Sequence, residues 1–400
     1  MKGNFEAPEE LGRWANIALG IGGLATVVIL IAALLDKNLI EQALRSWLLG
    51  FCLWGGISVG SIGILLLQYL TGGAWGVVIR RIAEAASRTL PAAFFLFLPI
   101  LIGAGSLYAW MHPVAGDEIL QKRAPYLNYP FWATRAVMYF VLWGVIAYLL
   151  NKWSRQVDET NDWSLLQKAS RFSGPTMVFF VLIVTFAAID WVMTLDAHWY
   201  STIWGLLFVV NWALSSFSFA IVILAWLSQR APMNRVVGKR HFHDLGKLVL
   251  ALVMVWAYFN FSQFLIIWSG NLPEETEWYI TRMAGGWGVI GIAVILLHFA
   301  FPYLVLLSRD IKRNAKYLAA LAIFILLMRL VDLFYIIAPA PTTTSHGAEI
   351  PFHVSWMDFV APVAIGGIWL WWFFGELRKR PLVPINDPFL ESAIEHGKGH

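Results

Sequence analysis

The run WLLGFCLWGGISVGSIGILLLQYL, residues 47–70, decides the fold class of this 400-residue chain. Its 24 residues include no Asp, Glu, Lys or Arg. A helix needs ~20 mainly apolar residues to cross ~30 Å of hydrocarbon, so this run is long enough to span a membrane. Gly55, Gly56, Gly60 and Gly63 lie within it, and small residues permit close contact between helices in a membrane. We therefore predict a transmembrane helix that packs closely against a neighbour in its own bundle or in a partner subunit.

Similar apolar stretches recur along the chain. Of its residues, 59% are hydrophobic and only 14% are charged, which is more apolar than a soluble core requires. Ten stretches are long enough to span a bilayer: about residues 14–35, 47–70, 91–111, 131–150, 175–195, 201–227, 245–269, 282–307, 316–338 and 354–376. The longest loops between them, residues 71–90 and 151–174, are too short to fold as domains. We predict one all-α integral membrane domain, residues 1–400, with ten transmembrane helices.

The basic residues predict the orientation of these helices. Of 29 Lys and Arg residues, 21 lie in the amino-terminal segment, the carboxy-terminal segment and every second loop between, whereas four lie in the other loops and four within or at the ends of spans. Basic residues near span ends are retained on the cytoplasmic side of a membrane. An even number of spans therefore places both termini in the cytoplasm. The formal net charge of +4 reports this topology, and we expect no nucleic-acid binding.

The histidines and the single cysteine argue against a metal or haem site. A membrane cytochrome b needs paired histidines at middle depth. Of nine histidines, only His298 is deep in a predicted span, while the others lie near span ends or in loops: His112, His198, His241, His243, His346, His353, His396 and His400. Cys52 stands alone inside the second span, so the chain has no cysteine pair for a disulfide or a cluster. We predict no metal site and no redox cofactor in this chain.

Ionisable and hydroxyl side chains inside spans are the candidates for function, since they are costly in hydrocarbon. The proton-pathway candidates are Arg135, Tyr139, Asp190, Asp196, His198, His298, Arg329, Asp332 and Asp358. Arg329 and Asp332 are three residues apart, so they share one helix face and can pair. Two interpretations remain open: a proton relay through the bundle, or structural pairing in which Arg329 neutralises Asp332 and Asp190 pairs with Arg135 or caps a helix end.

Five longer motifs resemble one known family. They are residues 56–81 (GISVGSIGILLLQYLTGGAWGVVIRR), 190–202 (DWVMTLDAHWYST), 256–268 (WAYFNFSQFLIIW), 271–279 (NLPEETEWY) and 301–310 (FPYLVLLSRD). Together they resemble the F-type membrane subunit of bacterial alternative complex III, a quinol:cytochrome c oxidoreductase, within the NrfD/polysulfide-reductase membrane-subunit family. This resemblance extends over essentially the whole chain. It implies ten helices, with spans two to five and six to nine forming two four-helix bundles that the first and last spans flank.

The resemblance also implies a place in a bacterial inner-membrane assembly of respiratory or photosynthetic electron transport. The implied partners are multihaem and monohaem cytochrome c subunits, an iron-sulfur subunit, a paralogous C-type membrane subunit and small membrane subunits, with lipids around them. These partners would hold the haems and iron-sulfur clusters. A quinol site needs an apolar cleft and a proton acceptor, and Tyr108, His112 and Asp190 are the quinone-binding candidates.

Several functions are consistent with these features. A supporting and proton-translocating subunit without its own redox centre is favoured over a working quinol site. A stand-alone secondary transporter is the alternative from another class, and it would place discontinuous helices and polar residues near the bilayer midplane. The predicted spans look continuous, and their polar residues favour the half opposite the termini, which argues against a transporter. A purely structural anchor is the remaining alternative.

Overall fold

The computed structural model describes residues 5–113, 116–342 and 351–398. Lys2, His346 and His400 lie outside these ranges. Throughout the described ranges the regular structure is helical. Eight long helices are α1 (Glu10–Leu35), α2 (Leu39–Thr71), α7 (Tyr129–Thr160), α8 (Ser164–Trp191), α9 (Trp204–Leu227), α10 (Lys239–Gly270), α15 (Ala315–Ile337) and α16 (Met357–Leu377). A ninth long helical segment consists of α12 (Gly285–Ala293), a π-helical segment (Val294–Ala300) and α13 (Phe301–Leu307).

Shorter helices complete the fold. They are α3 (Ala74–Ser87), α4 (Leu90–Ile102), α5 (Ala104–Leu107), α6 (Glu118–Arg123), α11 (Pro273–Met283), α14 (Arg309–Arg313) and α17 (Leu390–Lys398). Helices α3 and α4 meet at a bend of 43° and together form one broken span. Within the described residues there are nine helices that are long and apolar enough to cross a membrane, or ten with this bent pair. The chain is an all-α, multi-span membrane protein, as the sequence predicts.

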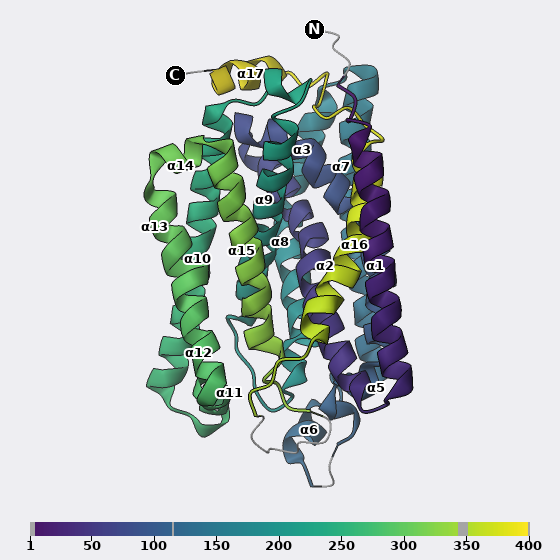
Figure 1. Ribbon diagram of the computed structural model, residues 1–400, viewed down its shortest axis with the longest axis vertical. Helices are drawn as coiled ribbons and strands as arrows, with labels where there is room; N and C mark the ends of the chain where they lie inside the picture. Colours follow the sequence, from purple (N-terminus) through teal and green to yellow (C-terminus); the bar gives the residue numbers. More distant parts are fainter. Residues whose placement is uncertain (1–4, 114–115, 343–350, 399–400) are drawn as a thin grey trace.

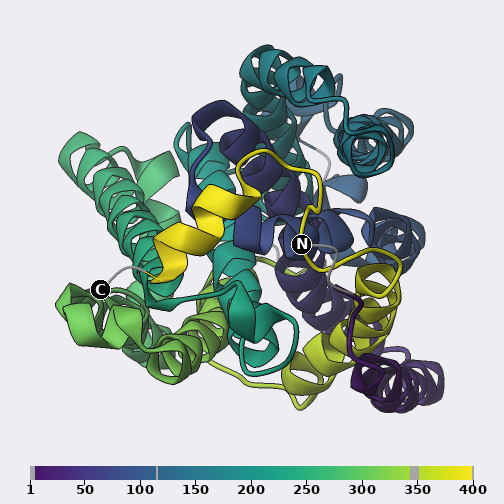
Figure 2. The same cartoon turned by 90° about the horizontal axis from the view of Figure 1, so that it is seen from above.

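The spans form two groups with a flanking pair. The first group contains α2, α4, α7 and α8, and the second contains α9, α10, α12, α13 and α15. Helices α1 and α16 pack along each other beside the first group (Figures 1 and 2). The start of α1 and the carboxy-terminal helix α17 lie at the same end of the bundle, here called the terminal face (Figure 1). The other end is called the opposite face.

Helix α2 of the first group packs against α9 of the second, and its glycines allow a close approach. A Cβ atom on Gly60 would lie 2.2 Å from the backbone oxygen of Trp212 in α9, and one on Gly56 would lie 2.3 Å from the ring of Trp212. Only glycine leaves room for that backbone contact. The close helix contact predicted from these glycines is confirmed, and it lies within the bundle.

The two long predicted loops are in fact mostly helical. Residues 74–87 form α3, and residues 151–174 are the ends of α7 and α8 around a short turn. Charged residues make these segments look like loops, yet the charges neutralise one another: Arg81 Nη1 lies 2.6 Å from Glu84 Oε2, and Arg81 also pairs with Asp158. Arg80 pairs with the buried Asp387 of the carboxy-terminal segment. Pairing permits burial of charged groups, which composition alone does not predict.

The third predicted span is interrupted, which corrects the expectation that every span is continuous, and the eighth begins later than predicted and contains a π-helical segment. In the third, the helix ends at Ile102 and gives way to α5 and a 3₁₀ turn over residues 109–111. In the eighth, the membrane helix begins at Gly285, because residues 273–283 form the separate helix α11. Its π-helical segment precedes Pro302, which has no N–H to donate to the carbonyl of His298. Because the third span is discontinuous, the helices of this chain do not exclude a transporter by their continuity.

Candidate functional site

The carboxylate of Asp190, near the end of α8, is held by two residues of α7. Arg135 donates from Nε to Oδ2 at 2.8 Å and from Nη2 to Oδ1 at 2.9 Å. The Tyr139 hydroxyl donates to Oδ2 at 2.6 Å. Asp190 is fully buried and Arg135 is nearly so. The structure therefore brings three of the predicted residues together. Of the two structural roles left open for Asp190, pairing with Arg135 and capping of a helix end, it shows the pairing.

Aromatic rings enclose the cation of this pair. The Cζ atom of Arg135 lies 3.8 Å from the ring centroid of Tyr126 and 4.3 Å from that of Phe131. Its Nη1 donates to the backbone oxygen of Tyr126 at 3.1 Å. The ion pair, the hydrogen bonds and the ring contacts together fix the position of this guanidinium. The Asp190 site is built to hold α7 against α8.

A second buried ion pair lies within α15. Arg329 donates from Nη1 to Oδ2 of Asp332, three residues further along the helix. Both side chains are almost completely buried. Arg329 Nη2 has no hydrogen-bond partner among the described residues. The pairing predicted from the spacing of these two residues is confirmed, and it leaves one donor of the guanidinium unused.

His298 lies beside this pair, in the π-helical segment. Its side chain is fully buried, and neither Nδ1 nor Nε2 has a hydrogen-bond partner within the described part of the chain. The ring of Trp256, from α10, lies edge-to-face against it with centroids 4.6 Å apart, and Arg329 is close enough to act on it electrostatically. The Nε1 atom of Trp256 also has no partner among those residues. Buried polar atoms are normally hydrogen-bonded, often to internal water.

We call His298, Trp256, Arg329 and Asp332 the central polar cluster. Its members come from three spans: α10, the segment α12–α13 and α15. Two pair with each other, while His298 and Trp256 present polar atoms without protein partners in the described chain. Segments of π-helix are rare and are frequent at functional sites. This cluster is the strongest candidate for proton chemistry in the structure.

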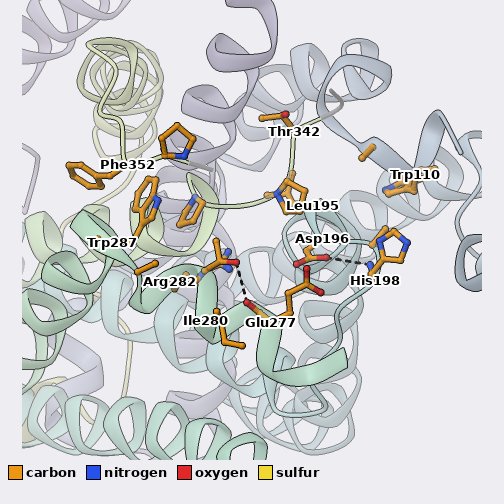
Figure 3. Close-up of a pocket in the computed structure, with 18 of the residues that line it drawn as sticks. Trp110, Leu195, Asp196, His198, Glu277, Ile280, Arg282, Trp287, Thr342 and Phe352 are labelled. Atoms are coloured by element: carbon orange, nitrogen blue, oxygen red, sulfur yellow. Dashed lines mark hydrogen bonds between the residues drawn. The ribbon is translucent and has the colours of Figure 1, made fainter. Parts of the chain in front are cut away.

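A cavity of about 920 Å³ opens at the opposite face between the two groups of spans (Figure 3). The segments that follow α5 and α8 contribute Trp110, His112, Asp196 and His198 to its lining, among others. The second contributes Glu277, Arg282 and Trp287, and the chain after α15 adds Thr342. Its volume suits a ligand of moderate size or a body of ordered water.

Two predicted residues at this cavity have different surroundings. His198 Nε2 lies 2.7 Å from Oδ2 of Asp117, whose Oδ1 accepts a 3.0 Å hydrogen bond from the backbone N–H of Leu120. That N–H and the neighbouring His198 lower the pKa of Asp117. Asp196 Oδ1 accepts from the backbone N–H of His198 at 3.4 Å, and no other hydrogen bond to this carboxylate occurs within the described chain. Asp196 thus presents a carboxylate to the cavity with little protein contact.

The three quinone-binding candidates do not line a common cavity. Tyr108 is fully buried and donates from its hydroxyl to the backbone oxygen of Trp191 at 2.9 Å. His112 lines the cavity and lies 2.8 Å from the backbone oxygen of Gly105 through Nε2. The Asp190 carboxylate is enclosed by Arg135 and Tyr139, as described above. Only His112 is therefore available to a ligand in this cavity.

Asp358, the last proton-pathway candidate, lies at the start of α16. Its Oδ1 accepts from Gln42 Nε2 at 3.0 Å and from Ser46 Oγ at 2.6 Å, and its Oδ2 accepts from the backbone N–H of Ser355 at 2.9 Å. An acidic residue at a helix start satisfies backbone donors and is favoured by the helix dipole. This carboxylate therefore ties α16 to α2.

Sequence reasoning did not single out Trp256, Glu277 or Tyr335. One sequence signal was available in this region: Pro302 lies four residues after His298 and predicts a disturbed helix at that histidine. A search for the neighbours of His298 would then have led to Trp256. In the described residues, no three His, Cys, Asp or Glu side chains are grouped as metal ligands would be.

Comparison with known proteins adds no identification. No family model matches the chain, and no curated protein matches it.

Proposed function

We propose that this chain is the membrane subunit of a quinol:electron-acceptor (cytochrome c) oxidoreductase complex, in which it supports the assembly and translocates protons without its own redox cofactor. The proposal combines the five motifs that resemble the F-type subunit of alternative complex III with one structural observation. That observation is the buried His298, whose two ring nitrogens have no hydrogen-bond partner among the described residues, beside the Arg329–Asp332 pair.

The chemistry of the cluster supports a proton-transfer role. A neutral imidazole can accept a proton at one ring nitrogen and release one from the other, provided that both are free of fixed partners. Asp332 is a buried carboxylate paired with Arg329, the residue that acts electrostatically on His298. Intramembrane ionisable residues are functional candidates, because burying them costs free energy that apolar residues at the same positions would not. The Asp190–Arg135 pair is a weaker candidate for proton transfer, since both carboxylate oxygens and all three guanidinium nitrogens form hydrogen bonds.

The proposed location is a bacterial inner membrane, with both termini in the cytoplasm. In this orientation the opposite face lies on the periplasmic side. The excess of basic residues near the terminal face supports this orientation. The redox centres would be haems and iron-sulfur clusters of partner subunits: multihaem and monohaem cytochromes c, an iron-sulfur subunit and a paralogous C-type membrane subunit. Small membrane subunits and lipids complete the proposed surroundings.

The test uses the complete complex, reconstituted into liposomes with a quinol and a cytochrome c. His298→Ala, His298→Gln and Asp332→Asn are expected to abolish proton translocation while electron transfer continues in the presence of an uncoupler. Glu159→Gln, at an exposed site on α7, is the matched control and should keep both activities. Haem content per complex reports assembly. Full translocation in all three cluster variants would refute the proton-translocating role, and failure of the chain to co-purify with cytochromes c would refute the placement.

One observation favours a second function, quinol binding by this chain. The cavity at the opposite face combines aromatic rings, Trp110 and Trp287, with the nearly unpartnered carboxylate of Asp196. Apolar walls and one proton acceptor are what a quinol head group requires. A quinol carrying a photoreactive group should then label residues of this cavity, and exclusive labelling of the paralogous subunit would eliminate this function.

A further inference from the structure

Polar groups continue from the central polar cluster toward the cavity along α15. Asp332 and Tyr335 are three residues apart on this helix and so share one face. The Tyr335 hydroxyl donates to the backbone oxygen of Arg282 at 3.4 Å. Asp332 lies five residues before the end of α15 at Ile337, a rise of about 7.5 Å along the axis. The chain that follows α15 supplies Pro339, among others, to the cavity wall.

Arg282 marks the boundary between this face of α15 and the cavity. Its Nε donates to the backbone oxygen of Tyr335 at 3.2 Å and its Nη2 to that of Ile336 at 2.7 Å. These are carbonyls of the last helical turn, which lack partners within the helix. Arg282 also lines the cavity, where Asp196 is close enough to interact with it electrostatically. It therefore fixes the end of α15 at the cavity wall.

In the part of the chain that the structure describes, the first group of spans offers no comparable route. Its buried carboxylate, Asp190, has both oxygens occupied by Arg135 and Tyr139. Asp332 differs from Asp190 in this respect. The hydroxyl of Tyr335 lies on the same face of α15 as Asp332 and nearer to the end of the helix that leads to the cavity.

We propose that the opposite-face cavity is the water-filled mouth of the proton path, that Tyr335 connects it to Asp332, and that Asp196 is the proton acceptor within it. This inference rests on the proposed function. Tyr335 lies one residue contact behind the cavity wall, since its hydroxyl donates to Arg282 and Arg282 lines the cavity. In each transfer the Tyr335 oxygen receives one proton from the Asp332 side, and its own hydroxyl proton passes beside Arg282 to water in the cavity. Tyr335 therefore ends each transfer neutral and only one proton moves. Arg282 keeps its charge throughout and acts as a positioning residue.

The first test probes the cavity with cysteine chemistry. The chain has a single cysteine, Cys52, which is buried within α2, so an introduced cysteine can be modified selectively. Thr281 of α11 lines the cavity, whereas Thr276 of the same helix does not belong to its lining. Each is changed to cysteine and treated with a bulky, membrane-impermeant cationic thiol reagent from the opposite face of the reconstituted complex.

We expect modification of Thr281→Cys to eliminate proton translocation, and modification of Thr276→Cys to leave it unchanged. Mass measurement of the chain verifies that each thiol has reacted. A fully modified Thr281→Cys complex that still translocates protons would overturn the proposal, as would a Thr281→Cys thiol that the reagent fails to reach.

The second test removes single proton-carrying groups. Tyr335→Phe lacks only the hydroxyl, and Asp196→Asn lacks only the ionisable oxygen; both are expected to lose proton translocation while uncoupled electron transfer persists. Tyr279→Phe, whose hydroxyl accepts from Gln263 Nε2 at 3.1 Å outside the cavity lining, is the control. If the His298 and Asp332 variants lose translocation but these two keep it, the route is wrong and the proposed function stands. If the unmodified complex translocates no protons, the proposed function itself fails.

Discussion

Arg135 of α7 and Asp190 of α8 are joined by two parallel hydrogen bonds, from Nε to Oδ2 at 2.8 Å and from Nη2 to Oδ1 at 2.9 Å. A planar guanidinium matches a carboxylate in this way, and the two opposite charges cancel inside the bundle. Because Asp190 is completely buried, loss of its partner would leave a charge with no solvent to stabilise it. The pair is therefore a structural clamp between two spans.

Replacing Arg135 with Met should lower the free energy of unfolding by ~3–5 kcal/mol, the usual cost of breaking a buried ion pair from one side. The change keeps an unbranched side chain of similar length and removes the charge. Unfolding of the purified chain in mixed micelles measures the difference. Arg155→Gln is the control, because Arg155 forms a solvent-exposed pair with Glu159 on the same helix, and exposed pairs contribute little to stability. Equal effects of the two changes would show that Arg135 is not a clamp.

Tyr139→Phe should destabilise the chain less than Arg135→Met, by ~1.5–3 kcal/mol, since it removes one hydrogen bond to a charged acceptor. The carboxylate of Asp190 keeps both bonds from Arg135 in this variant. Tyr148→Phe on the same helix is the matched control, because Tyr148 is 64% exposed. The same unfolding measurement applies. An effect of Tyr139→Phe no larger than that of Tyr148→Phe would contradict the geometry at Asp190.

Gly60→Ala should destabilise the contact between α2 and α9 by ~1–3 kcal/mol, the range for overpacked sites. The added Cβ atom would meet the backbone oxygen of Trp212 at 2.2 Å, and backbone is unable to rotate away as a side chain does. Gly23→Ala, in α1, is the control, since a Cβ atom there meets nothing within 4 Å. Thermal stability in detergent is the measurement, and tolerance of both substitutions would mean that the two helices are further apart than described.

The loop that contains Asp117 should lose stability in acid. The Leu120 N–H and His198 lower the pKa of Asp117 in the folded state, so the carboxylate stabilises the fold above its unfolded pKa of ~4 and this contribution disappears as pH falls through the lower folded value. Asp117→Asn should therefore reduce the thermal midpoint at neutral pH, and the difference from the natural chain should shrink as the pH falls below the unfolded pKa of ~4. A difference that stays constant with pH would contradict this linkage.

Much of the architecture follows from length and hydrophobicity in the sequence. Ten apolar stretches and the alternation of basic residues predict an even number of spans, and the two described chain ends do lie at one end of the bundle (Figure 1). The Arg329–Asp332 pair is also local, because residues three apart on one helix face meet whatever surrounds them. These features depend on the geometry of the α-helix and on the thickness of the bilayer, which are the same whichever helices pack together.

Tertiary structure alone decided which distant groups meet. Asp190 had two possible structural roles in the sequence, and packing of α7 against α8 selected Arg135 as its partner. The neighbours of His298 come from α10 and α15, and the cavity is shared by two groups of spans, so neither could be derived from local spacing. Residues 74–87, expected as part of a loop, form the buried helix α3, whose charged side chains have partners of opposite charge. Helical periodicity specifies the face on which a side chain lies, whereas its partner depends on how whole helices pack.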